Sequence, residues 1–175
     1  MRKRWRGSND GEGAELKISG RRAPVTQVKP EIIATSALTI ETPHRGFFDI
    51  TADARQFLRE AEAHTGALTL FVRHTSASLT IQENADPDVL TDLTTALERL
   101  APENAGWIHD SEGPDDMPAH IRTMLTSTSL TIPVIDAAMA LGVWQRIYLI
   151  EHRARPHRRE IVLQFFGSEI KSGSG

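Results

Sequence analysis

Cysteine is absent from the 175-residue chain, which excludes disulfide bonds and thiolate metal ligands. A metal site in this protein therefore has to be built from imidazole and carboxylate groups. A chain without disulfides also fits a reducing compartment, and we expect a cytoplasmic protein.

Long apolar runs are lacking too. No stretch approaches the roughly 20 apolar residues that a membrane-spanning helix needs. The basic start, residues 1–13, is not followed by the apolar core of a secretory signal. A net charge of −3 argues against broad nucleic-acid binding. We therefore expect neither a membrane nor a nucleic acid as partner.

Two common catalytic motifs are also missing. There is no glycine-rich phosphate loop of the Walker or Rossmann type. The G-x-S-x-G elbow of serine hydrolases is absent as well. Candidate chemistry therefore rests on histidines, carboxylates and arginines.

Composition divides the chain into three parts. Residues 1–29 mix Gly, Ser, Arg and Lys with few apolar residues, which predicts a flexible N-terminal extension. Residues 171–175 predict a flexible C-terminal end. Residues 30–170 between them have the size of one domain with a hydrophobic core.

Strand patterns outnumber helix patterns in this domain, and most connections are short. This predicts an α+β fold, a β-sandwich of largely antiparallel sheets with flanking helices. Thr51 is expected to cap a helix that Gly66 ends, and Pro87 to open another. Strands are expected at 31–41, 67–72, 129–135, 145–152 and 159–166, and helices at 52–64, from 87 to Pro102, and at 119–125.

Polar residues follow the apolar strand 67–72. In the run Arg73–Ser78, His74 is a candidate metal ligand or acid/base, and the hydroxyls are candidate anion contacts. The alternative is a turn whose hydroxyls bond to the local backbone. A second polar run, Gln82–Asp88, includes Asn84. Its Asp and Asn residues suit a helix N-terminus, but capping does not account for every polar side chain there.

The segment His109–His120 is the strongest candidate for a metal site. Two histidines flank four carboxylates, including Glu112 and Asp116, in a stretch that also contains Gly and Pro. Gly and Pro fix an irregular backbone, so several side chains can converge. Imidazole and carboxylate suit zinc, manganese or iron. The alternative is an acidic surface loop with incidental histidines.

A fourth cluster closes the strand 145–152. His152 and Arg153 follow Glu151 there, and a basic loop, residues 155–159, comes next. Arginines suit phosphate recognition. A solvated basic turn is the competing interpretation.

Taken together, these segments resemble the YjbQ or UPF0047 family. The similarity covers His74–Thr80, Glu83–Pro87, His109–Ile121, Gly142–Gln145 and Glu151–Arg153 in the same order, within about residues 33–167. The loop 154–158 departs from the family pattern because it lacks the usual paired glycines. This departure bears on how an anionic substrate would be held.

The resemblance implies a β-sandwich with flanking helices, assembled as a homotrimer, with a histidine-lined metal or anion pocket. It also implies a secondary thiamine-phosphate synthase activity, which joins a pyrimidine diphosphate to a thiazole phosphate. The expected cofactor is a divalent ion, zinc first, with manganese or magnesium as alternatives, and the expected ligand is a small phosphorylated molecule.

Site residues follow position by position from the resemblance. The metal ligands would be His109, His120 and His152. The matched pocket positions are His74, Asn84, Glu112 and Asp116, with His74 as a proton donor or phosphate contact and Arg153 as an electrostatic clamp. The alternatives are a non-catalytic protein that binds a metal or small anion, and a metal-assisted hydrolase in the same pocket.

Overall fold

The structure, a computed structural model, describes residues 23–170. The predicted C-terminal end, 171–175, and most of the predicted extension, 1–29, lie outside these residues. Residues 23–29 are exposed and form neither helix nor strand. In the described part of the chain, no helix is long and apolar enough to cross a membrane.

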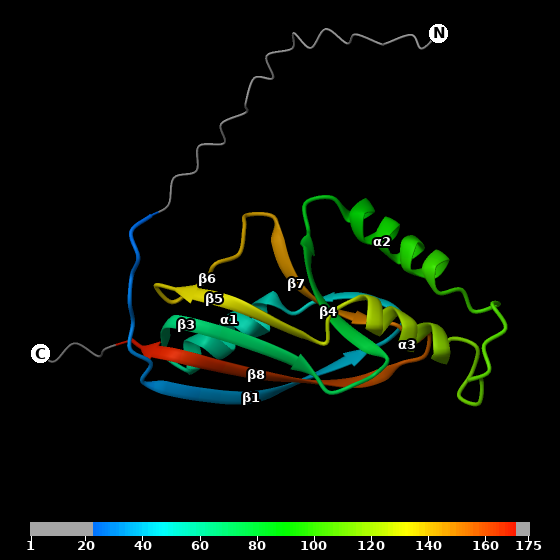
Figure 1. The fold of residues 1–175 in the computed structure, drawn as a ribbon, viewed down its shortest axis with the longest axis horizontal. Coiled ribbons are helices and arrows are strands. Elements are labelled where there is room, and N and C mark those ends of the chain that lie inside the picture. Colours follow the sequence, from blue (N-terminus) through cyan, green and yellow to red (C-terminus); the bar gives the residue numbers. More distant parts are fainter. Residues whose placement is uncertain (1–22, 171–175) are drawn as a thin grey trace, which may run out of the picture.

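Two antiparallel sheets form the frame of the described domain, which confirms the predicted α+β fold (Figure 1). The large sheet has the order β1 (Ile32–Thr42), β8 (His157–Glu169), β3 (Ala63–Val72), β5 (Ser129–Ile135) and β6 (Ala138–Met139). The small sheet has the order β2 (Gly46–Asp49), β7 (Gln145–Glu151) and β4 (Ala77–Glu83).

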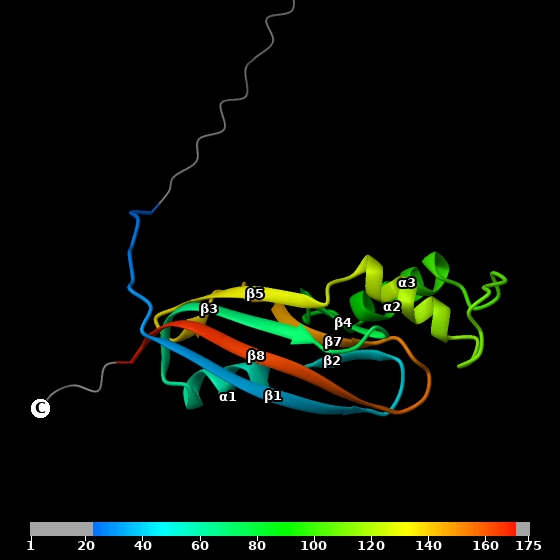
Figure 2. The ribbon, with the colours of Figure 1, turned by 60° about the horizontal axis from the view of Figure 1, so that its bottom comes forward.

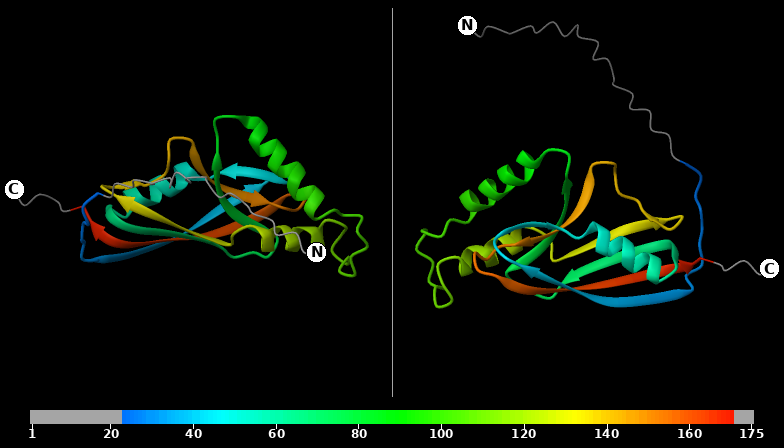
Figure 3. Two further views of the ribbon diagram at one scale, coloured as in Figure 1. Left: turned by 45° about the horizontal axis from the view of Figure 1, so that its top comes forward. Right: turned by 180° about the vertical axis from the view of Figure 1, so that it is seen from behind.

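The core lies between the inner face of the large sheet and two covering elements. Alternate residues of β3, such as Leu68 and Leu70, point inward, as do Leu163 and Phe165 of β8. The small sheet and helix α1 (Thr51–Glu60) cover this face, as the view from behind shows (Figure 3, right). Each buried side chain of this size contributes about 1.5–3 kcal/mol.

Helices α2 (Pro87–Leu100) and α3 (Asp116–Leu125) lie together at one end of the molecule, away from the end where β8 finishes (Figures 1 and 2). The predicted start of α2 is confirmed, because the Asp86 carboxylate accepts the N–H of Asp88 at 2.9 Å. The two helices are joined by Arg122, which donates to the carbonyl oxygens of Leu97 and Ala101 near the end of α2. Positive charge is favourable there.

The first helix differs from the prediction at both ends. Thr51 does not cap it, since its hydroxyl accepts the N–H of Ile147 instead. The helix ends at Glu60, and Gly66 lies within β3. A Cβ on Gly66 would come within 2.3 Å of the Phe166 carbonyl oxygen. This glycine therefore permits close strand contact rather than a helix end. Strands β2, β4 and β6 were not predicted from the sequence.

The two-residue turn between β5 and β6 generates a stability prediction. Asp136 and Ala137 have φ of +48° and +64°, a conformation that costs L-residues roughly 1–2 kcal/mol and glycine little. Greater freedom of glycine in the unfolded chain offsets part of the gain. We predict that Ala137→Gly raises the free energy of unfolding by about 0.5 kcal/mol in urea titrations. The matched control Ala138→Gly, in β6, should lower it; a loss in both variants would contradict the prediction.

Candidate metal centre

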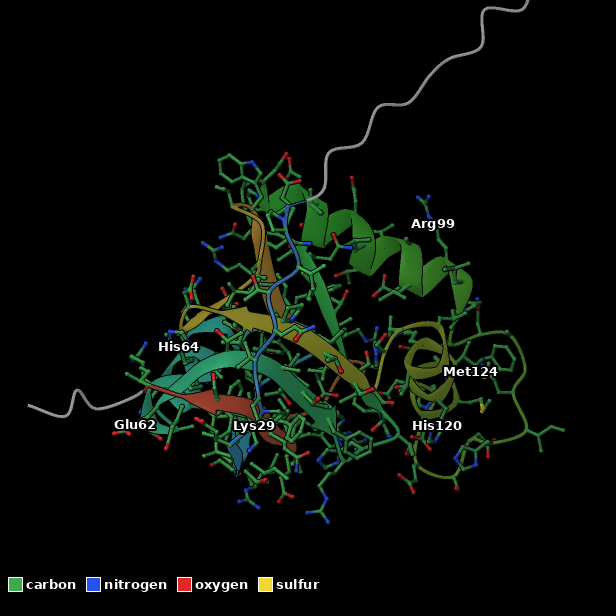
Figure 4. All side chains as sticks on the ribbon, turned by 60° about the vertical axis from the view of Figure 1, so that its left-hand side comes forward. Lys29, Glu62, His64, Arg99, His120 and Met124 are labelled. Atoms are coloured by element: carbon green, nitrogen blue, oxygen red, sulfur yellow. The ribbon has the colours of Figure 1, made fainter. Side chains whose placement is uncertain are left out.

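Three side chains near the start of α3 bring their ligand atoms within 4.8 Å of one another: His109, Asp116 and His120. Asp116 and His120 are four residues apart on α3, so they share one face of the helix. His109 belongs to the preceding loop, which turns at Gly113 with φ of +113°. Figure 4 shows His120 on α3, well separated from His64 at the other end of the molecule.

The tautomer of the neutral His120 ring is set by the backbone. Its Nδ1 lies 3.0 Å from the carbonyl oxygen of Thr75. A carbonyl oxygen only accepts, so in the neutral ring Nδ1 carries the proton and Nε2 has the lone pair. This Nε2 lies 3.8 Å from Oδ1 of Asp116. A backbone partner on one ring nitrogen is the usual way of orienting a metal-binding histidine.

Asp116 is 2% exposed, and its two oxygens have different surroundings. Oδ1 pairs with Nη1 of Arg153. Oδ2 lies 2.8 Å from Nε2 of His109, but not in the direction that a hydrogen bond requires, so this buried oxygen has no donor in the described residues. A buried carboxylate with one oxygen that lacks a hydrogen-bond donor thus lies beside two imidazole rings. A cation bound here could be ligated by the carboxylate and by both rings.

The spacing of these atoms is close to that around a divalent ion. Ligand atoms around tetrahedral zinc lie roughly 3.3 Å apart, given bonds of about 2.0–2.2 Å. Here the ligand atoms lie within 4.8 Å of one another, and His109 Nε2 is 2.8 Å from Oδ2 of Asp116. His109 and His120 are partly exposed, so the site can be reached from solvent.

Arg153 is almost fully buried and faces acidic groups. Besides Asp116, its Nε lies 3.3 Å from Oδ2 of Asp115, and its Nη2 donates to the carbonyl oxygen of Glu112 at 2.8 Å. Burial alone would raise the pKa of Asp115, but the N–H of Ala154 and the Arg153 charge outweigh it and lower that pKa. Asp115 was not among the predicted site residues, because nothing in the sequence pattern distinguishes it from its neighbour Asp116.

His152 lies outside the three-residue group. It is buried, and its Nε2 is 2.8 Å from the hydroxyl of Ser78. Burial and then the Arg122 charge lower its pKa to about 3, so the ring is neutral at ordinary pH. Its assignment as a metal ligand stays a prediction, and Nε2 is occupied by Ser78 in this structure.

His74 lines a surface hollow beside the group. The N–H of Glu160 donates to its Nε2 at 2.9 Å, so Nδ1 carries the proton. Burial and then the charge of Arg159 lower the pKa of His74, which keeps the ring neutral. The hollow shares Thr75 with the candidate metal centre, through the carbonyl that orients His120. It is lined by Phe71, Val72, Arg73, His74, Thr75, Ser76 and Thr128.

The two remaining predicted residues, Glu112 and Asn84, lie outside the group of His109, Asp116 and His120. Glu112 is exposed, and its carboxylate is 3.7 Å from Nη1 of Arg153 at the edge of the group. Asn84 follows β4 at the end opposite to Ala77, and its N–H bonds to the carbonyl of Trp144. The length of β4 therefore separates Asn84 from the candidate metal centre within one chain.

Comparison with known proteins gives the family. Residues 36–168 match the family described as UPF0047 protein YjbQ-like. The chain belongs to the YjbQ/UPF0047 family. It is 47% identical to the UPF0047 protein sll1880 of Synechocystis sp. over 131 residues, which covers 74% of this chain and 89% of that protein. It is 40% identical to the UPF0047 protein YjbQ of Escherichia coli O157:H7, covering 74% and 95%.

Solved structures share the fold. A YjbQ/UPF0047 protein from Clostridium acetobutylicum superposes with a TM-score of 0.69 at 31% identity, covering 74% of this chain and 98% of that one. The hypothetical protein APE1520 from Aeropyrum pernix superposes with a TM-score of 0.71 at 26% identity, covering 77% and 99%. Family and fold are thereby established.

Buried His152 predicts an acid-sensitive stability. Its pKa is about 3 when folded and about 6.5 when unfolded, so the unfolded chain takes up the proton first as the pH falls. The free energy of unfolding of metal-free protein should drop by up to about 1.4 kcal/mol per pH unit between pH 6.5 and 3 from this group. Urea titrations at several pH values across this range should show that the free energy of unfolding falls less steeply with decreasing pH in His152→Gln than in wild type. Equal slopes would show that His152 does not carry the effect.

Proposed function

We propose that this YjbQ-family protein binds one divalent ion, zinc first, through His109, Asp116 and His120. The proposal rests on the buried carboxylate of Asp116, whose Oδ2 has no hydrogen-bond donor in the described residues. Its Oδ2 faces Nε2 of His109 at 2.8 Å, and its Oδ1 lies 3.8 Å from Nε2 of His120. The proton of His120 is already held on the far nitrogen by Thr75.

The ligand set points to the class of ion and of site. Two imidazoles and one carboxylate suit zinc, manganese or ferrous iron, whereas magnesium prefers oxygen ligands alone. Three protein ligands leave a coordination position open, which is typical of catalytic rather than structural zinc. We therefore favour catalysis over simple metal storage.

We propose thiamine-phosphate formation as the reaction. The nitrogen of a thiazole phosphate forms a bond to the methylene carbon of a pyrimidine diphosphate, and the C–O bond breaks with its electron pair leaving on the diphosphate. No proton has to be removed from either substrate. When bound, the ion would supply charge stabilisation for the departing diphosphate.

The hollow beside the centre supports a phosphate-binding role. His74 accepts the Glu160 N–H at Nε2 and so presents Nδ1–H, its lowered pKa favours the neutral ring, and the neighbouring Thr75 is exposed. Both groups can donate to phosphoryl oxygens without changing protonation state. His74 is accordingly a fixed donor in this proposal rather than a general acid. That role suits a reaction that needs charge stabilisation more than proton transfer.

We also propose that the protein is a homotrimer assembled through the outer face of the large sheet. Ile33, Phe166 and Phe71 are 67%, 51% and 47% exposed on this face. Ile33 and Phe166 are paired across β1 and β8, and Phe71 pairs with Val162 in the same sheet. These two apolar pairs lie on one sheet face, with the polar row of Thr35, Gln164 and Thr69 between them. Exposed apolar side chains of this kind favour burial against another copy.

Light scattering during gel filtration tests the assembly. The expected mass is three times the 19.4 kDa of one chain. Phe166→Lys should lower it, because the new charge would be buried between copies. The control Gln56→Lys, on the exposed side of α1, should leave it unchanged. A wild-type monomer would refute the assembly.

Metal content of tag-free protein tests the site. We expect about one equivalent of zinc, manganese or iron per chain by plasma mass spectrometry, and loss of that ion in His120→Ala. The matched control His64→Ala, at the other end of the molecule, should keep it. Absence of metal from wild type, even after incubation with zinc or manganese, would refute the metal site.

Turnover assays on the metal-loaded protein distinguish the candidate functions. Pyrophosphate release from the pyrimidine diphosphate only in the presence of the thiazole phosphate would support the synthase. Phosphate release from simple esters without that acceptor would indicate a hydrolase instead. Stoichiometric metal with neither reaction would leave a metal-binding protein without the proposed catalysis.

A further inference from the structure

Arg153 has each of its three nitrogens turned toward the segment 112–116. Nη1 pairs with Asp116, Nε faces Asp115, and Nη2 donates to the carbonyl of Glu112. The residue is only 8% exposed. A guanidinium group held in this way does not present a free edge to a substrate phosphate, which argues against the predicted role as a clamp.

The same contacts give the two oxygens of the Asp116 carboxylate different partners. Oδ1 is taken by Arg153, and Oδ2 alone faces His109. A carboxylate without such a partner can rotate and offer either or both oxygens to an ion. The planar guanidinium fork restricts that rotation because it bonds to two fixed points at once.

Arg153 is itself fixed from the core. Its backbone N–H donates to Oε1 of Glu151 at 2.9 Å, and Glu151 is fully buried. The neighbouring N–H of Ala154 donates to Asp115 at 2.8 Å, which ties the same segment to the end of β7 a second time. The end of β7 therefore takes part, together with the loop that precedes α3, in setting the orientation of Asp116.

We propose that Arg153 is a positioning residue, which holds Asp116 so that a single oxygen, Oδ2, is presented to the metal ion. This rests on the proposed metal site. Groups that orient a ligand in this way typically change metal affinity 10–100-fold when they are removed. A lysine would keep the charge but could not bond to Asp116 and the Glu112 carbonyl with one planar group.

Zinc affinity and the cobalt spectrum test this role in the full-length chain. Zinc dissociation constants are measured by competition with a chromophoric chelator, and visible absorption is recorded with saturating Co²⁺. We expect about 10–100-fold weaker zinc binding and altered cobalt bands for Arg153→Met, with Arg153→Lys between it and wild type. Arg155→Met, an exposed arginine in the same loop, is the control and should match wild type. A purely structural role would lower the melting temperature without changing the cobalt bands.

A double-mutant cycle shows whether Arg153 acts through Asp116. In the Asp116→Asn background, the further change Arg153→Lys should weaken zinc binding less than about threefold, because the ligand it positions is gone. Additive losses would overturn the proposal, as would an unchanged affinity and spectrum in both Arg153 variants when wild type binds zinc. If wild type itself binds neither zinc nor cobalt, the metal site fails as well. The two failures are therefore distinct.

Discussion

The buried ion pair between Glu151 and Arg159 holds the two sheets together at the end of the molecule where the candidate metal centre lies. Both Glu151 oxygens accept from Arg159 at 2.6 Å, and they also accept from the hydroxyl of Thr42 and the N–H of Arg153. Burial alone would raise the pKa of Glu151, but these donors outweigh it and lower that pKa. Loss of either partner of such a pair costs about 3–5 kcal/mol, since the other charge stays buried.

The candidate site is built outward from this pair. Glu151 fixes the backbone of Arg153, and Arg153 fixes Asp116 at the start of α3. On the other side, Arg159 donates to the hydroxyl of Ser76, in the loop whose Thr75 carbonyl orients His120. Ligand residues from the α3 segment thus depend on contacts from β7, from β8 and from the β3–β4 loop.

The sequence predicted the fold class, but not which side chains would meet. The segment His109–His120 concentrates imidazole and carboxylate in an irregular stretch, and three of its side chains do lie together in the structure; that they bind a metal stays a prediction. The surroundings of His152 could not be predicted from the sequence. Most of β7 is buried, so strand alternation does not reveal which neighbour a given side chain faces. Its partner Ser78 lies in β4, a strand that was not predicted. Gly66 is a similar case, because a glycine that allows close strand contact looks like one that ends a helix.

The carbonyl oxygen of Thr75 links the candidate metal centre to the neighbouring hollow. It belongs to the loop that contributes His74 and Ser76 to the neighbouring hollow, and it also orients His120. If both proposed sites are occupied, an occupant of the hollow that moved this loop would change the metal affinity. Thermodynamic linkage would then require the ion to change the affinity of the hollow by the same factor. One peptide group would thus couple the two proposed sites.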